Sequence, residues 1–244
     1  MTQPAQTDKP KRAKKVAPVA APHLKYEFTG ETKDWLGTTL HRIRALVAIA
    51  SLGVEAGDLG GWIEKEFNLS QVYGNAWVSG DARVYGNARV YGNARVYGDA
   101  RVSGDAQVYG DARVYGNAQV YGDALVSGNA LVSGNARVSG DARVSGDAWV
   151  SGDAQVSGNA RVYGNARVYG VNIVATRSDG YTFLVAPTPN GPRIIAGCRY
   201  FTFKQAKDHW KANRGGTKLG DESLSIVSHL EKMAKINGFM EPVK

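Results

Sequence analysis

The chain has 244 residues, of which 43% are hydrophobic, and a net charge of +8. This length allows one or two domains, and the apolar share excludes a chain that is disordered throughout. The single cysteine, Cys198, together with the lack of a signal peptide or a long apolar run, favours a reducing cytoplasm over a disulfide framework or a membrane span. We expect Cys198 to be a small buried side chain.

Residues 1–22 form a basic segment that contains four prolines and almost no large apolar side chain. This composition is typical of a disordered tail. A solvated linker is the ordinary role of such a tail, and contact with nucleic acid is the alternative. The charge comes from Lys9, Lys11, Arg12, Lys14 and Lys15.

Residues 23–71 contain short β-like stretches at 25–28 and 40–46, separated by turn residues. We interpret this region as a small N-terminal β cap.

A repeat of six residues begins at Val72 and continues to Arg167 in sixteen consecutive units. Its rule is Val, Tyr or Ser, Gly, Asn or Asp, Ala, and a variable residue. The stretch from Ala through Val to Tyr or Ser alternates inward and outward side chains as a strand does. Gly followed by Asn or Asp suits a corner, because these residues tolerate a positive φ. Each unit therefore predicts one short strand and one corner.

Three such strands would close an 18-residue coil, and coils would stack at the spacing of paired strands, about 4.8 Å. Valine would then lie over valine and alanine over alanine. About five coils would fill residues 72–170, and both ends of the stack would need caps. The sequence thus predicts a mainly β protein built on a parallel β-helix.

The pattern resembles the left-handed β-helix of hexapeptide-repeat proteins, in which an aliphatic residue is followed four positions later by a small one, as Val72 is by Ala76. The segment GVEAGDLGGWIEKEFNLS, at residues 53–70, also resembles the region that leads into the first coil of YdcK-like and prophage-encoded hexapeptide-repeat proteins. That family has no assigned activity. The resemblance implies left-handed coils and a phage or prophage origin.

Residues 171–244 predict a C-terminal α+β module. Strands are expected at 171–176, 181–186 and 193–198, joined by two turn sequences. Thr202 and Gln205 form a capping box for a first helix through Trp210, and a second, amphipathic helix starts at Asp221 or Ser223 and ends before Gly238. We interpret its apolar stripe as a packing surface.

Hexapeptide β-helices include acyltransferases and zinc-dependent carbonic anhydrases, which use histidine as a base or as metal ligands. All four histidines here lie outside the repeats: His23, His41, His209 and His229. A run of near-identical units offers no unique pocket. We therefore predict no enzymatic activity, no cofactor and no metal site, with an acyltransferase as the residual alternative.

The variable residues sort onto three walls of the expected β-helix. Wall two carries Arg83, Arg101, Gln119, Arg137 and Gln155, and wall three carries Arg89, Gln107, Leu125, Arg143 and Arg161. Wall one is the candidate binding face, because Trp and Leu are unusual on a solvated wall. Its residues are Trp77, Arg95, Arg113, Leu131, Trp149 and Arg167.

The arginines allow two interpretations. They could pair with the Asp residues of the repeat and leave a neutral wall, which we favour, or they could form Arg and Tyr ladders that hold an anion or a nucleotide. The leading hypothesis is a cytoplasmic, non-enzymatic binding or scaffold protein that acts through protein contacts, on a host factor if phage-encoded, or through self-association. Binding of nucleic acid or nucleotides is the main alternative, and we expect no membrane contact.

Overall fold

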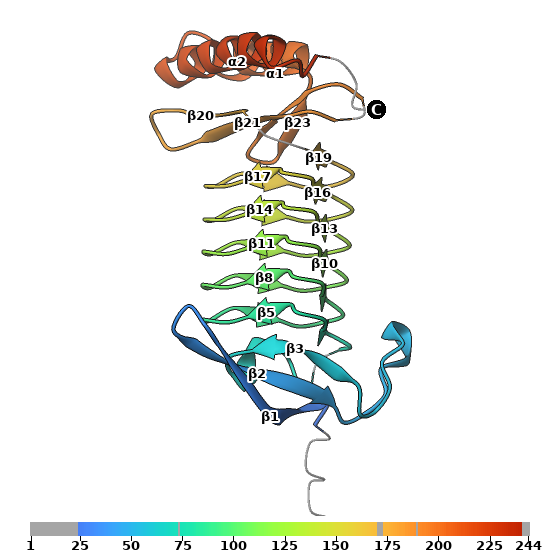
Figure 1. The fold of residues 1–244 in the computed structure, drawn as a ribbon. Helices are drawn as coiled ribbons and strands as arrows, with labels where there is room; N and C mark the ends of the chain where they lie inside the picture. The colour runs from blue at the N-terminus through green and yellow to red at the C-terminus, as the bar shows by residue number, and fades with distance from the viewer. Residues whose placement is uncertain (1–23, 73, 170–172, 189, 241–244) are drawn as a thin grey trace, which may run out of the picture.

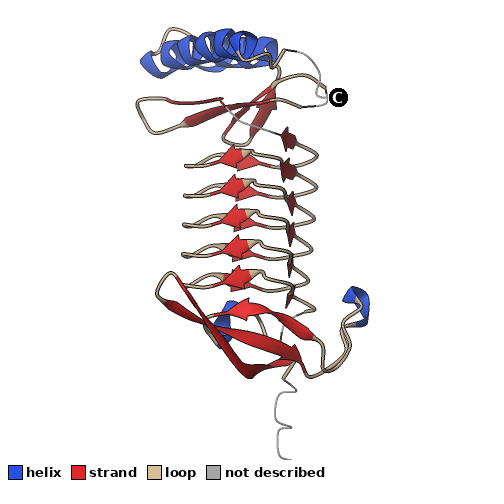
Figure 2. Ribbon diagram, in the orientation of Figure 1, coloured by secondary structure: helices blue, strands red, loops and turns tan. Residues whose placement is uncertain are grey.

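The structure is a computed structural model that describes residues 24–72, 74–169, 173–188 and 190–240. The molecule is a rod made of stacked coils (Figure 1). An antiparallel sheet lies at the N-terminal end of the rod, and a small sheet covered by two helices lies at the other end (Figure 2). The predicted basic tail, residues 1–22, falls outside the described residues.

The repeats form a parallel β-helix, which confirms the predicted fold class. Each strand pairs in parallel with the strand one coil further on, so that Val114 lies beside Val132 and Val120 beside Val138. Paired residues are therefore 18 positions apart in the sequence, which is the predicted period. The strands are β4 (Trp77–Val78), β5 (Arg83–Val84), β6 (Arg89–Val90), β7 (Arg95–Val96), β8 (Arg101–Val102), β9 (Gln107–Val108), β10 (Arg113–Val114), β11 (Gln119–Val120), β12 (Leu125–Val126), β13 (Leu131–Val132), β14 (Arg137–Val138), β15 (Arg143–Val144), β16 (Trp149–Ser151), β17 (Gln155–Val156), β18 (Arg161–Val162) and β19 (Arg167–Tyr169).

The interior of the β-helix is a column of valine and alanine. Every inward residue from Ala76 to Val168 is at most 3% exposed. The corners require glycine for two reasons, as Gly104 shows. Its φ is +66°, and a Cβ there would lie 2.9 Å from the backbone nitrogen of Gly122 in the next coil. Uniform packing along the column explains why the repeat varies so little.

The stack starts below the first predicted unit. Strand β3 (Leu59–Ile63) pairs in parallel with β5, placing Ile63 beside Val84, and Leu69 forms a parallel bridge with Val90. These partners are 21 residues apart, so the lowest coil holds three more residues than the others. Val72 is 68% exposed, and its interpretation as an inward residue is wrong. Leu69 takes that inward role, six residues after Ile63.

The N-terminal cap is built on a hairpin of β1 (Tyr26–Trp35) and β2 (Thr38–Ala45), with two short 3-10 turns, η1 (Ala50–Leu52) and η2 (Glu66–Asn68). The hairpin strands extend the predicted stretches, and β2 pairs with β3, which continues into the sheet of wall two. Cation–π contacts fasten the hairpin to that wall. Arg83 and Arg101 lie 4.0 and 4.7 Å from the ring centre of Trp35.

The C-terminal module contains an antiparallel sheet of β20 (Ile173–Thr176), β21 (Thr182–Ala186), β22 (Arg193–Ala196) and β23 (Arg199–Phe201), followed by α1 (Phe203–Arg214) and α2 (Lys218–Ile236). The first three strands match the predicted meander, and β23 is additional. The predicted capping box of Thr202 and Gln205 starts α1. Helix α2 starts earlier than expected, because the hydroxyl of Thr217 accepts a hydrogen bond from the backbone of Gly220 and caps it.

This small sheet separates the helices from the β-helix. Its inner face, which includes Leu184 and Ile195, joins the valine and alanine core. Its outer face, which includes Phe183 and Ile194, packs against the helices with Trp210. The apolar stripe of α2 is thus buried inside the module, as predicted.

A buried arginine fastens the first hairpin of this sheet to α2. Arg177 is 5% exposed and donates two hydrogen bonds to the carboxylate of Asp179, at 2.9 and 2.7 Å, and one to the hydroxyl of Ser223, at 2.8 Å. Hydrogen bonding to this guanidinium lowers the pKa of Asp179 to about 2. Cys198, in contrast, is exposed, so our expectation that it is buried is wrong. It lies in the turn between β22 and β23, outside both hydrophobic cores.

Candidate binding site

The six residues predicted for wall one lie on one sheet. That sheet has the order β19-β16-β13-β10-β7-β4, and its register places Arg113 between Arg95 and Leu131. Trp149 follows Leu131, and Arg167 completes the column. The grouping made from spacing alone is therefore correct.

Trp77 is not available at the surface of wall one. Its side chain is 4% exposed and lies in the core cluster of the β-helix. It shares a small hollow with Leu52, Val54 and Leu59, which belong to the N-terminal cap. The indole of Trp77 is therefore an internal contact between the cap and the β-helix.

Trp149 is half-buried, and the wall itself accounts for this burial. Its indole N–H donates to the hydroxyl of Ser133 at 3.3 Å, and its ring meets that of Tyr169 edge-on at 5.7 Å between centres. Ser133 and Ser151 are only 6% and 8% exposed. Serine in place of tyrosine at these positions leaves room for the large ring. Helix α2 takes no part in these contacts, since it packs on β20 and β21.

The prediction that the repeat arginines pair with the repeat aspartates is wrong. Among the described residues, no repeat arginine lies within 4.0 Å of a repeat carboxylate. The arginines stand on the flat walls, whereas the aspartates stand at the corners. There several accept hydrogen bonds from asparagine one coil below, as Asp111 does from Asn93 at 3.1 Å and Asp147 from Asn129 at 2.9 Å.

This separation leaves cationic walls between polar corners. Arg113 and Arg167 are exposed on wall one, and Arg95 is partly exposed. Arg143 and Arg161 are likewise exposed on wall three. A guanidinium without a carboxylate neighbour keeps its donors available for an anionic group on another molecule.

Two pairs of wall tyrosines are stacked. The rings of Tyr91 and Tyr109 lie 5.0 Å apart and 3° from parallel, and those of Tyr97 and Tyr115 have the same spacing and angle. Burial, followed by the neighbouring phenol, raises the pKa of Tyr91 and of Tyr97. Each of these four rings covers one face of its neighbour, whereas Tyr121 and Tyr163 are 39% and 41% exposed.

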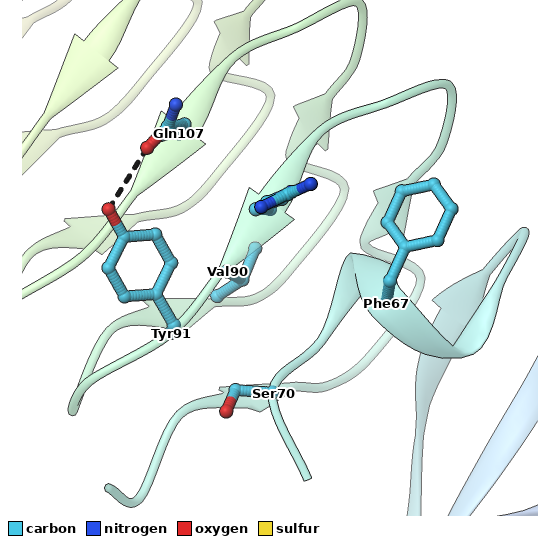
Figure 3. Close-up of a pocket in the computed structure, with 6 residues that line it drawn as sticks. Phe67, Ser70, Val90, Tyr91 and Gln107 are labelled. Atoms are coloured by element: carbon cyan, nitrogen blue, oxygen red, sulfur yellow. Dashed lines mark hydrogen bonds between the residues drawn. The ribbon is translucent and has the colours of Figure 1, made fainter. Parts of the chain in front are cut away.

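A notch that the sequence analysis missed lies between η2 and wall three (Figure 3). It encloses about 390 Å³ and adjoins a second hollow of about 570 Å³ that shares Phe67, Arg89 and Gln107. The Phe67 side chain rises beside the wall across from Tyr91 and Gln107. Strand alternation from inward Leu69 would turn Phe67 inward. Phe67 points outward because η2 replaces the strand at this position, so the repeat pattern gave no signal of the notch. The notch is lined by Phe67, Ser70, Arg89, Val90, Tyr91 and Gln107.

The described histidines lie at the two ends of the rod. The ring of His41 stacks on Phe28 at 4.8 Å, and His209 contacts Phe201 and Trp210 at 5.1 and 5.0 Å. Burial lowers the pKa of His209. In the described part of the chain no group of three or more His, Cys, Asp or Glu residues could hold a metal ion, and no helix is long and apolar enough to cross a membrane.

Stacked six-residue units with inward valine and alanine define the protein as a repeat β-helix, or β-solenoid. The YdcK β-solenoid repeat family matches eight stretches that together span residues 70–152 and 154–170. The protein is thus a YdcK-like repeat β-helix protein, because its repeat region matches the model of this family. The first stretch that the family model matches begins at Ser70, close to the first coil of the structure. A search of curated proteins found no match.

Proposed function

We propose that this protein is a non-enzymatic binding protein whose arginine-bearing walls contact an acidic protein partner. The observation that carries the proposal is the separation of charge, because wall arginines lack carboxylate partners while corner aspartates accept hydrogen bonds from asparagines. Unpaired guanidinium groups at interfaces form strong, geometrically specific contacts with carboxylates. A rigid stack also holds these groups at fixed spacing, which lowers the entropic cost of binding.

Residues 53–70 resemble a segment of prophage-encoded proteins, and this resemblance supports a proposal about the origin of the protein and of its partner. We propose a phage- or prophage-encoded protein that acts in the host cytoplasm on a host factor. Self-association through wall one is the competing use of the same surface.

The two rival functions have less support. An acyltransferase needs a histidine beside a pocket, and neither His41 nor His209 lines a described cavity. A nucleotide binder that stacks bases needs open aromatic faces, and four of the wall tyrosines each have one face covered by a stacked neighbour. Titration with an acyl donor and with single-stranded DNA at two salt concentrations tests both rivals directly.

The test of the proposal removes charge from one wall at a time. A triple variant, Arg95→Gln, Arg113→Gln and Arg167→Gln, should fold normally, because glutamine already occupies the equivalent position at Gln119. The protein and the variant are each used to capture host proteins, and a captured partner is then titrated in solution. We expect the triple variant to lose an acidic partner that the unchanged protein retains.

A matched triple variant, with Arg137→Gln on wall two and Arg143→Gln and Arg161→Gln on wall three, removes the same number of charges and serves as the control for net charge. If both variants capture the same proteins as the unchanged protein, wall one is not the contact surface. If the unchanged protein instead elutes as an oligomer that the triple variant converts to monomer, wall one is used for self-association.

A further inference from the structure

The notch between η2 and wall three combines an exposed aromatic ring with an unpaired cation. Phe67 is 47% exposed, although its neighbours Asn68 and Leu69 are fully buried. The guanidinium carbon of Arg89 lies 6.0 Å from the centre of the Phe67 ring, and Lys65 Nζ lies 5.6 Å from it. Two cations therefore flank one projecting ring.

Only one of these cations is available to a ligand. Lys65 Nζ lies 2.9 Å from Glu64, an ion pair that occupies its charge. Arg89 is exposed and has no carboxylate within 4.0 Å among the described residues. Asp105, at the rim of the adjoining hollow, accepts a hydrogen bond from Asn87 at 3.0 Å instead. Arg89 thus brings an uncompensated positive charge to the notch.

The rest of the notch is built firmly. Asn68 is fully buried and fixes η2, because its side-chain N–H groups donate to the carbonyl oxygens of Gly86 and Ala88, at 3.2 and 2.8 Å. Its side-chain oxygen accepts from the backbone N–H of Lys65 at 2.7 Å. The opposite wall is also fixed, because the Tyr91 hydroxyl donates to the side-chain oxygen of Gln107 at 3.0 Å (Figure 3). This bond turns the oxygen of Gln107 toward Tyr91 and leaves its amide N–H groups for a ligand.

We infer that the notch binds a carboxylate side chain of a peptide together with a neighbouring apolar group. The carboxylate would accept hydrogen bonds from Arg89 and from the amide of Gln107, and the apolar group would pack on Phe67. This inference rests on the proposed function, since it assigns the acidic partner a specific anchoring point. A planar carboxylate matches the paired donors of a guanidinium, and the ring beside it supplies apolar contact area.

The test uses 3-phenylpropionate as a probe, because it joins one carboxylate to one apolar ring. Ligand-observed NMR should show saturation transfer from the full-length protein to the probe at millimolar concentration. The neutral amide of the same compound should bind at least about tenfold more weakly, because it lacks the charge that Arg89 pairs with. Phenyl phosphate provides a further comparison, and tighter binding of this compound than of the carboxylate would overturn the assignment of a carboxylate.

Two variants locate the probe. Arg89→Gln and Phe67→Ser should each weaken binding of 3-phenylpropionate by about tenfold or more. Arg143→Gln, on the same wall but outside the notch, should leave binding unchanged. Unfolding of each variant by heat shows whether the fold is intact. Equal binding of the probe by all three folded variants would overturn the inference.

Partner capture separates failure of this inference from failure of the proposed function. If the probe binds through Arg89 but no protein is captured, the notch is a carboxylate site and the proposed function fails. If an acidic partner is captured equally by the unchanged protein and by the Arg89→Gln variant, the proposed function stands and the notch is not its anchor.

Discussion

The side chain of Lys25 is buried beneath the N-terminal end of the β-helix, where its charge is costly. It is 6% exposed, and Nζ has no hydrogen-bond partner among the described residues. Burial alone lowers its pKa from 10.5 to about 8. Between these two pH values the unfolded chain holds a proton that the folded chain has released. The contribution of Lys25 to stability is therefore most unfavourable below pH 8 and improves as the pH rises to about 10.5.

Replacement of Lys25 by Met keeps the length of the side chain and removes the charge. We expect Lys25→Met to raise the free energy of unfolding by about 1 kcal/mol at pH 7, with the gain shrinking as the pH approaches 10.5. Urea unfolding at several pH values measures this difference. Lys232→Met, at an exposed position of α2, is the control and should show no such trend. A gain that is independent of pH would argue against the buried charge as its cause.

At the scale of single elements, the tip of the β1–β2 hairpin departs from the best turn chemistry. Leu36 has a φ of +52° and Gly37 a φ of +78°, in a two-residue connection between paired Trp35 and Thr38. Such turns favour asparagine followed by glycine, because a residue with a bulky side chain, such as leucine, is strained at positive φ. The Leu36 side chain is 81% exposed, so it gains little from packing.

We expect Leu36→Asn to raise the free energy of unfolding by about 0.5 kcal/mol, because asparagine tolerates this backbone conformation better. Chemical denaturation measures the change. Leu36→Ala provides the comparison, since it removes the exposed side chain but keeps a strained β-carbon. If the alanine variant is as stable as the asparagine variant, the turn conformation is not the source of the effect.

At the scale of the whole molecule, each inner coil contacts only the coil above it and the coil below it, and the first and last coils also contact a cap. Deletion of residues 102–119 joins Arg101 to Val120 and removes one complete coil, so that every remaining side chain keeps its wall. We expect this variant to unfold cooperatively and to form a rod about 4.8 Å shorter, because the interrupted core column closes onto an identical coil. Circular dichroism and small-angle scattering measure the fold and the length.

A single substitution, Val120→Asp, should disrupt the same stack far more than the deletion does. It places an unpaired carboxylate in a column whose members are essentially unexposed, at a cost of more than about 4 kcal/mol. If the deletion destroys the fold while Val120→Asp leaves it stable, then the coils are not equivalent units around a dry core.

The sequence alone predicted the features that repeat. Valine and alanine every six residues predicted the inward column, and the 18-residue period placed Trp77, Leu131 and Trp149 on one wall, because identical units can stack only in register with themselves. The capping box of Thr202 predicted the start of α1 for a similar reason, since the signal lies within four residues.

The tertiary structure decided the features that depend on contacts between different segments. Trp77 is buried by Leu52 and Val54 of the cap, and the notch exists because η2 places Phe67 beside Arg89. The first coil starts at Ile63, because β3 pairs in parallel with β5. The Gln71 side chain then ties this coil to the hairpin: its oxygen accepts from the backbone N–H of Tyr26 at 3.1 Å, and its amide donates to the backbone oxygen of Tyr26 at 2.9 Å. The arginines stay unpaired because flat walls and corners keep them apart from the aspartates. A periodic pattern predicts which way a side chain points, but only the tertiary structure determines which non-repeating segment packs against that side chain.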